Sequence, residues 1–204
     1  MKFILLIMLI AQSIFSQSKG LKFNLPKGYV PYLNFDGKSN DFSGDLDGDN
    51  VKDKILVGTK KGDNQLFAFV YLTSNAKKGV VPSQVLYDWH PMGFEYKLKN
   101  KVISISSCFG NGRFCKTIRF RYDGEEKDLK VIGYDEESFG NAAHEGAYKS
   151  SYNLLTGDYE YTEYTFNEKK QDDEVKSTKK KKRKPTVITL SNLKENLKIL
   201  ESQD

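Results

Sequence analysis

The sequence is poor in the residues that most often carry catalysis. Its 204 residues include two histidines, two cysteines and one tryptophan. His90 and His144 are far apart in the chain, and neither stands beside a recognisable nucleophile. The sequence contains no G-x-S-x-G segment and no glycine-rich phosphate-binding loop. These absences exclude the common motifs of zinc hydrolases, serine hydrolases and nucleotide-binding enzymes, so we favour a binding or structural role over an enzyme.

Long apolar segments are also rare. Residues 3–10 form the one clear case; they follow the positive charge of Lys2 and precede the small, polar residues 12–17. This order is typical of a secretory signal peptide, with cleavage expected after Ser16. The segment is too short to span a bilayer, and no later segment approaches the required length. We therefore predict that residues 1–16 are removed and that the protein is secreted or periplasmic, without a membrane span.

The most informative segment is the acidic stretch of residues 45–53. Carboxylates occupy positions 1, 3, 5 and 9 of this stretch, and the backbone carbonyl of position 7 completes a set of oxygen ligands. Oxygen-only ligation favours calcium or magnesium over zinc, and the crowded negative charges repel one another unless a cation neutralises them. We predict that the stretch binds one Ca²⁺ ion. The predicted ligands are Asp45, Asp47, Asp49, Val51 and Asp53.

This calcium loop differs from an EF-hand, which has glycine at position 6 and glutamate at position 12. Asn50 and Leu56 occupy these positions here, although asparagine also tolerates the left-handed backbone of such a turn. The apolar residues 55–57 predict a buried strand rather than a helix. The loop and this strand together resemble the calcium loops of FG-GAP repeat proteins, such as integrin propellers and many bacterial secreted proteins. The resemblance implies a calcium site without implying an activity, and a single loop does not predict a propeller.

A second informative pattern is centred on Asn111-Gly112, a dipeptide that favours a two-residue hairpin turn. A turn at this point brings apolar side chains together on one face of the hairpin and polar side chains on the other. The same register places Cys108 opposite Cys115, which predicts a disulfide in an exported chain with two cysteines. The other predicted pairs are Ile103 with Phe120, Ser104 with Arg119, Ile105 with Ile118 and Ser106 with Thr117.

Similar alternating patterns predict strands through most of the chain. They cover residues 29–35, 54–59, 66–72, 117–122, 128–134, 148–154 and 159–166, with a short strand near Val85. Residues 17–170 are therefore predicted to form an all-β domain. We expect it to be mainly antiparallel, as a twisted sheet, a sandwich or a partial barrel.

The predicted strands 148–154 and 159–166 form a hairpin that is rich in tyrosine. Thr156-Gly157 is its predicted turn, which would pair Leu154 with Tyr159 and Tyr152 with Tyr161. Aromatic ladders of this kind are more typical of sheet packing than of a sugar-binding platform.

Residues 171–185 form a charged segment with almost no apolar side chains, which predicts a solvated basic linker. The formal net charge of the chain is +5, and the basic residues of this segment account for its sign. Since we predict export, nucleic acid is not an expected partner. We interpret the run as a solvated tether, with binding to an anionic surface as the alternative. The run consists of Lys179, Lys180, Lys181, Lys182, Arg183 and Lys184.

Residues 186–204 are predicted to return to the domain as a strand followed by a short helix. Leucines at positions 190, 193, 197 and 200 recur at helical spacing behind Ser191, a favourable N-cap residue. The apolar face of this helix should pack on the sheet.

Three functions remain open at this point. The leading interpretation is an exported, calcium-stabilised β-domain that acts as a binding or structural module, with an extracellular polymer or another exported protein as its partner. The first alternative is a secreted hydrolase of glycans or cell wall. It would use a pair of carboxylates from Asp135, Glu136, Glu137 and Glu145. The second alternative is a surface-adhesion factor that binds through the basic run.

Overall fold

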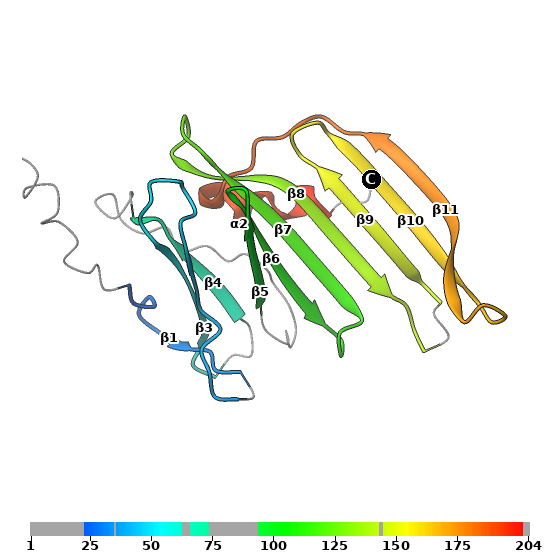
Figure 1. Cartoon of the computed structure of the whole chain (residues 1–204), viewed down its shortest axis with the longest axis horizontal. Coiled ribbons are helices and arrows are strands. Elements are labelled where there is room, and N and C mark those ends of the chain that lie inside the picture. Colours follow the sequence, from blue (N-terminus) through cyan, green and yellow to red (C-terminus); the bar gives the residue numbers. More distant parts are fainter. Residues whose placement is uncertain (1–22, 35, 63–65, 74–93, 143–144, 202–204) are drawn as a thin grey trace, which may run out of the picture.

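The computed structural model describes residues 23–34, 36–62, 66–73, 94–142 and 145–201. The predicted signal peptide, the predicted strand near Val85 and both histidines lie outside these residues. Within them, the chain forms two antiparallel β-sheets and a short helix near the carboxyl terminus (Figure 1). The predicted fold class, mainly antiparallel all-β with a short C-terminal helix, is confirmed.

The smaller sheet surrounds the acidic stretch. Strand β3 is its centre, with β4 along one edge and with β1 and β2 at opposite ends of the other edge. The acidic stretch forms the connection from β2 to β3 and is therefore held by two paired strands. The strands are β1 (Tyr29–Pro31), β2 (Phe42–Gly44), β3 (Asp53–Lys60) and β4 (Leu66–Tyr71).

All six residues of β4 are buried, although β3 is the only strand with which β4 pairs among the described residues. One face of β4 contributes Leu66, Ala68 and Val70 to the main core. The other face, with Phe67 and Phe69, packs in a second apolar cluster with residues from the start of the described chain. Burial of both faces therefore comes from packing above and below the strand, and not from a central place in the sheet.

The larger sheet is a seven-stranded meander in which each strand pairs with the next one along the chain (Figure 1). Short turns connect most of these strands, as expected for antiparallel neighbours. The strands are β5 (Phe94–Lys99), β6 (Val102–Phe109), β7 (Phe114–Asp123), β8 (Asp128–Phe139), β9 (Ala147–Asn153), β10 (Asp158–Asn167) and β11 (Asp172–Lys182).

The β6–β7 hairpin has the register that the sequence predicted. Its turn residues Asn111 and Gly112 adopt the left-handed backbone conformation, with φ of 59° and 81°. Cys108 lies opposite Cys115, and the two form a disulfide. All four predicted pairs are confirmed: Ile103 with Phe120, Ser104 with Arg119, Ile105 with Ile118 and Ser106 with Thr117.

Removal of this disulfide should have a modest effect. Because the disulfide closes a short loop, replacing both Cys108 and Cys115 with serine should lower the free energy of unfolding by about 2 kcal/mol. The register should survive, since the apolar pairs of the hairpin do not depend on the disulfide. Urea unfolding of the double variant, beside the reduced and oxidised parent, measures the difference. A double variant that no longer folds would contradict a register set by the apolar pairs.

The turn between β9 and β10 is centred one residue earlier than predicted. Residues 154–157 connect the strands and Asn153 lies opposite Asp158, so the centre is at residues 155–156 instead of Thr156-Gly157. The side chain of Asn153 favours this turn, because its Oδ1 accepts hydrogen bonds from two backbone N–H groups of the turn, at 3.0 and 3.2 Å. The predicted pairing of Leu154 with Tyr159 and of Tyr152 with Tyr161 is therefore wrong, and the structure pairs Tyr152 with Tyr159.

The prediction of a solvated linker at residues 171–185 is also wrong, because most of this segment is strand β11. The strand pairs with β10 along its whole length. Lys180 forms an ion pair with Glu160, and Lys182 forms one with Asp158, both at 2.8 Å. The low apolar content of the segment suggested disorder, but a strand at the edge of a sheet can expose polar side chains on both faces and still pair through its backbone.

The C-terminal segment packs on the large sheet as predicted. A short 3₁₀ turn, η3 (Leu190–Asn192), leads directly into helix α2 (Leu193–Glu201). Leu190, Leu193 and Leu200 are buried in the main core. The predicted strand before the helix is reduced to one bridge, between Thr189 and Lys130. None of the described helices is long and apolar enough to cross a membrane.

Ser191 does not act as the predicted N-cap. Its hydroxyl and its backbone N–H both donate to Asp128 Oδ2, at 2.6 and 3.0 Å. The residue that precedes the helical segment is Thr189, whose backbone N–H donates to the side chain of Asn192 at 2.9 Å. The contact with Asp128 ties the segment to the start of β8.

The two sheets share one apolar core. Side chains from β3 and β4 join side chains from β6, β7 and β8 in the main cluster of buried residues. Asn40, just before β2, binds the backbone of Phe94 through both its amide oxygen and its amide nitrogen, at 2.7 and 2.9 Å. The rings of Phe42 and Tyr96 stack across the same boundary with their centroids 5.4 Å apart. The strand that leads into the acidic loop, β2, is thus attached to the large sheet.

Candidate metal centre

The acidic loop combines an anchored residue with two tight bends. Leu46 points into the main core and is 1% exposed, so the beginning of the loop is fixed by packing. Gly48 and Asn50 take the left-handed conformation, with φ of 82° and 66°. The tolerance of Asn50 for this conformation is what the sequence predicted at position 6 of the loop.

Asp45, Asp47 and Asp49 bring their carboxylates together. One oxygen from each lies within 4.8 Å of the others. The loop backbone orients these groups: Asp45 accepts hydrogen bonds from the N–H groups of Gly48 and Asn50, at 2.6 and 3.1 Å. In the same way Asp47 accepts from the N–H of Asp49, and Asp49 accepts from the N–H of Val51. Three of the predicted ligands therefore converge at one point.

Asp53 has a different position from the other three acids. It is the first residue of β3 and is fully buried. Its Oδ2 accepts a hydrogen bond from the N–H of Leu46, and its Oδ1 accepts one from the N–H of Thr73, each at 2.7 Å. The carboxylate therefore connects the loop to the chain that leaves β4. Among the residues that the structure describes, the convergent acids are three, and Asp53 is not one of them.

The charges of the loop act on one another. Burial raises the pKa of Asp53 to about 6, and the negative charge of Asp47 adds to this effect, while the N–H groups of Thr73 and Leu46 oppose it. The pKa of Asp49 is also raised, first by burial and then by the charges of Asp47 and Asp45. A cation bound in the loop would favour the ionised form of both groups.

Lys101 is a neighbour of the loop that the sequence did not identify. It lies in the turn between β5 and β6, where Asn100 and Lys101 both have positive φ. Its ammonium reaches Gly48 so closely that a Cβ at that glycine would lie 2.9 Å from Nζ. The register of the β5–β6 hairpin brings this positive charge to the loop. Lys101 is far from the loop in the sequence, so the contact could not be predicted from the sequence alone.

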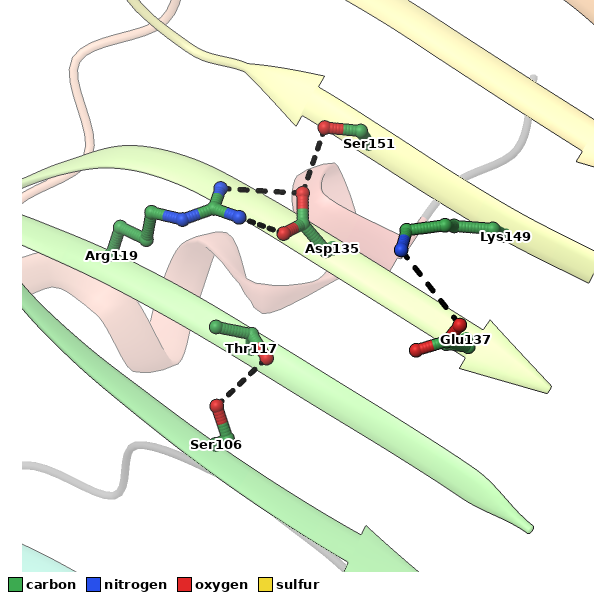
Figure 2. Close-up of polar contacts among 7 residues, drawn as sticks. All are labelled: Ser106, Thr117, Arg119, Asp135, Glu137, Lys149 and Ser151. Atoms are coloured by element: carbon green, nitrogen blue, oxygen red, sulfur yellow. Dashed lines mark hydrogen bonds and ion pairs between the residues drawn. The ribbon is translucent and has the colours of Figure 1, made fainter. Parts of the chain in front are cut away.

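The acids proposed for a hydrolase have separate partners. Asp135 and Glu137 alternate with Glu136 along β8, so Glu136 faces the opposite side of the sheet. Figure 2 shows Asp135 between Arg119 and Ser151, and Glu137 beside Lys149.

On the other face, Glu136 is nearly buried. It accepts a hydrogen bond from the hydroxyl of Tyr134 at 2.9 Å and forms an ion pair with Lys116 at 3.6 Å. Glu145 binds Asn141 in the loop after β8. In the described part of the chain these acids do not support the carboxylate pair of a glycosidase.

The basic run is divided among several environments. Lys180 and Lys182 lie in the ion pairs with β10, which leaves their charges partly neutralised. The guanidinium of Arg183 lies over the ring of Tyr159, with its central carbon 3.8 Å from the ring centroid. This position is typical of a cation–π contact. Lys179–Lys182 are therefore part of the sheet, and the run is not one uniform basic surface.

Comparison of the chain with protein-family models, with curated proteins and with solved structures finds no match.

Proposed function

We propose that this protein is an exported, calcium-stabilised β-domain that acts as a binding or structural module. The observation that carries the proposal is the convergence of Asp45, Asp47 and Asp49 from one short loop, within 4.8 Å of one another. Hard oxygen ligands in this number favour calcium. The likeness of the loop to FG-GAP calcium loops supports the same ion, and the apolar segment at residues 3–10 supports export.

The loop residues would have two roles in this proposal. Asp45, Asp47 and Asp49, with the backbone carbonyl of Val51, would hold the ion. Asp53 would act mainly by holding the loop in place, because it is fully buried and is not one of the convergent carboxylates. Calcium would supply the positive charge that keeps the three convergent carboxylates together. The ion would thus make the β2–β3 connection rigid, and a rigid connection is what a structural or binding module requires.

Hydrogen exchange of the loop amides tests this role. Calcium should slow exchange at the N–H groups of Gly48, Asn50 and Val51 by roughly ten- to a hundredfold, because loop opening must first release the ion. These N–H groups donate to loop carboxylates, so they report directly on loop opening.

The β7–β8 turn offers a matched control. The N–H groups of Glu125 and Glu126 also donate to an aspartate, Asp123, but this aspartate is far from the calcium loop in sequence. Their exchange should be the same with calcium and with chelator. Equal exchange in the calcium loop under both conditions would contradict the proposed role of the ion.

A further inference from the structure

Strand β11 has two features that the calcium proposal does not use. It is the last strand of the seven-stranded sheet, and no described strand pairs with its outer edge (Figure 1). Its charges are also segregated along its length. Asp172, Asp173 and Glu174 form its first end, and Lys179–Lys182 form its last end with no acid among them.

The open edge and the charge order together indicate a specific kind of partner. An edge strand presents backbone donors and acceptors that can pair with another strand. Lysines commonly protect such edges from association, but protection does not require acids at the other end of the strand. In a parallel pair of β11 strands, like charges would oppose one another. In an antiparallel pair, the acidic end of each strand lies against the basic end of the other.

We propose that β11 pairs antiparallel with β11 of a second copy of this chain, so that two seven-stranded sheets join into one. The pairing with β10 is interrupted between Glu163 and Tyr164, where Lys176 is an extra residue in β11. A two-fold axis near Lys176 and Ser177 keeps the faces of both strands matched on either side of this bulge. It places Lys179, Lys180 and Lys181 opposite Glu174, Asp173 and Asp172 of the second copy.

The existing ion pairs of β11 are compatible with this dimer. Lys180 binds Glu160 and Lys182 binds Asp158, but the lysine side chains remain 73% and 66% exposed. Glu174 binds Lys170 at 2.6 Å, and its side chain remains 41% exposed. Exposed pairs of this kind contribute little to stability, so their rearrangement costs little. In the dimer, Lys180 would lie between Glu160 of β10 and Asp173 of the second copy. Alternating charges would then extend across the junction.

Charge-reversal variants test the pairing through the oligomeric state of the full chain. The first variant replaces Asp172, Asp173 and Glu174 with lysine, and the second replaces Lys179, Lys180 and Lys181 with glutamate. Light scattering should show a dimer for the parent chain and a monomer for each variant alone. An equimolar mixture of the two variants should regain the dimer, because each now carries a strand of one sign. Circular dichroism checks that each variant retains its β-structure.

The parent chain supplies a second test that needs no variant. Raising the NaCl concentration from about 0.05 to 0.5 M shortens the Debye length from about 14 to 4 Å, so the dimer dissociation constant should rise by roughly tenfold or more. A parent chain that stays monomeric at all concentrations would overturn the proposal, even if it bound an acidic peptide from another protein. A dimer that ignores salt, or a variant mixture that stays monomeric although both variants fold, would overturn it too.

Discussion

Replacing Asp53 with alanine should lower the free energy of unfolding by roughly 2 to 5 kcal/mol in the absence of calcium. The carboxylate is fully buried and accepts hydrogen bonds from the N–H groups of Leu46 and Thr73. Its removal leaves two backbone donors without an acceptor in the interior, and a buried donor without a partner is costly. Chemical denaturation in the presence of chelator measures the loss.

Two controls accompany this variant. Asp53→Asn should be intermediate, because the amide retains one acceptor oxygen and replaces the other with a donor. Asp36→Ala changes an exposed aspartate outside the calcium loop, and its effect should stay within about 0.5 kcal/mol. If Asp53→Ala were as mild as Asp36→Ala, the role of Asp53 as the acceptor between the loop and β4 would be wrong.

Calcium should stabilise the folded protein by an amount comparable to the loss expected for Asp53→Ala. We expect a dissociation constant of roughly 10⁻⁵ to 10⁻⁴ M, between those of calcium sensors and of extracellular modules. At about 1 mM calcium, preferential binding to the folded chain then adds about 1.4 to 2.7 kcal/mol to the free energy of unfolding. For a domain of this size the melting temperature should rise by roughly 3 to 10 °C relative to chelator. Differential scanning calorimetry measures the shift.

Asp47→Ala should remove this calcium-dependent gain without the cost expected for Asp53→Ala. Asp47 is one of the three convergent acids, so its loss removes a predicted ligand. In chelator the variant should be as stable as the parent or more stable, because one charge that raises the pKa of Asp49 and Asp53 has gone. A variant that keeps the full shift with calcium would contradict the assignment of Asp47 as a ligand.

The features that could be predicted from the sequence depend on neighbours along the chain. The register of the β6–β7 hairpin follows from Asn111-Gly112 and from two strands whose polar and apolar positions match. The disulfide of Cys108 with Cys115 follows from that register. The turn at Asn50 follows from the tolerance of asparagine for positive φ. In each case the physical cause lies within a few residues.

The features that could not be predicted depend on contacts made later in folding. Strand β11 exists because β10 offers a paired edge and acids opposite Lys180 and Lys182, and composition alone does not show such a partner. The inward position of Asp53 depends on the N–H of Thr73, which β4 brings to it. Lys101 approaches the loop through the β5–β6 hairpin. These contacts join segments that are far apart in the sequence, and two of the strands involved, β5 and β11, were not predicted as strands.

The pKa of Asp53 links calcium binding to pH. In calcium-free protein this pKa is raised to about 6, so the folded state retains a proton that the unfolded state has already lost, and stability falls as pH rises towards 6. Bound calcium favours the ionised carboxylate and therefore competes with this proton. Calcium affinity should accordingly be higher above about pH 6 than below it.

Calorimetric titration of calcium into the chelator-treated full chain tests the proposed metal centre most directly. At about pH 7.5 the parent should bind one ion with a dissociation constant of roughly 10⁻⁵ to 10⁻⁴ M, and binding should weaken at about pH 5.5. Asp36→Ala should titrate like the parent, whereas Asp47→Ala should show no heat of specific binding. A parent chain that gives no more heat than Asp47→Ala, with calcium raised well above 1 mM, would contradict the calcium site.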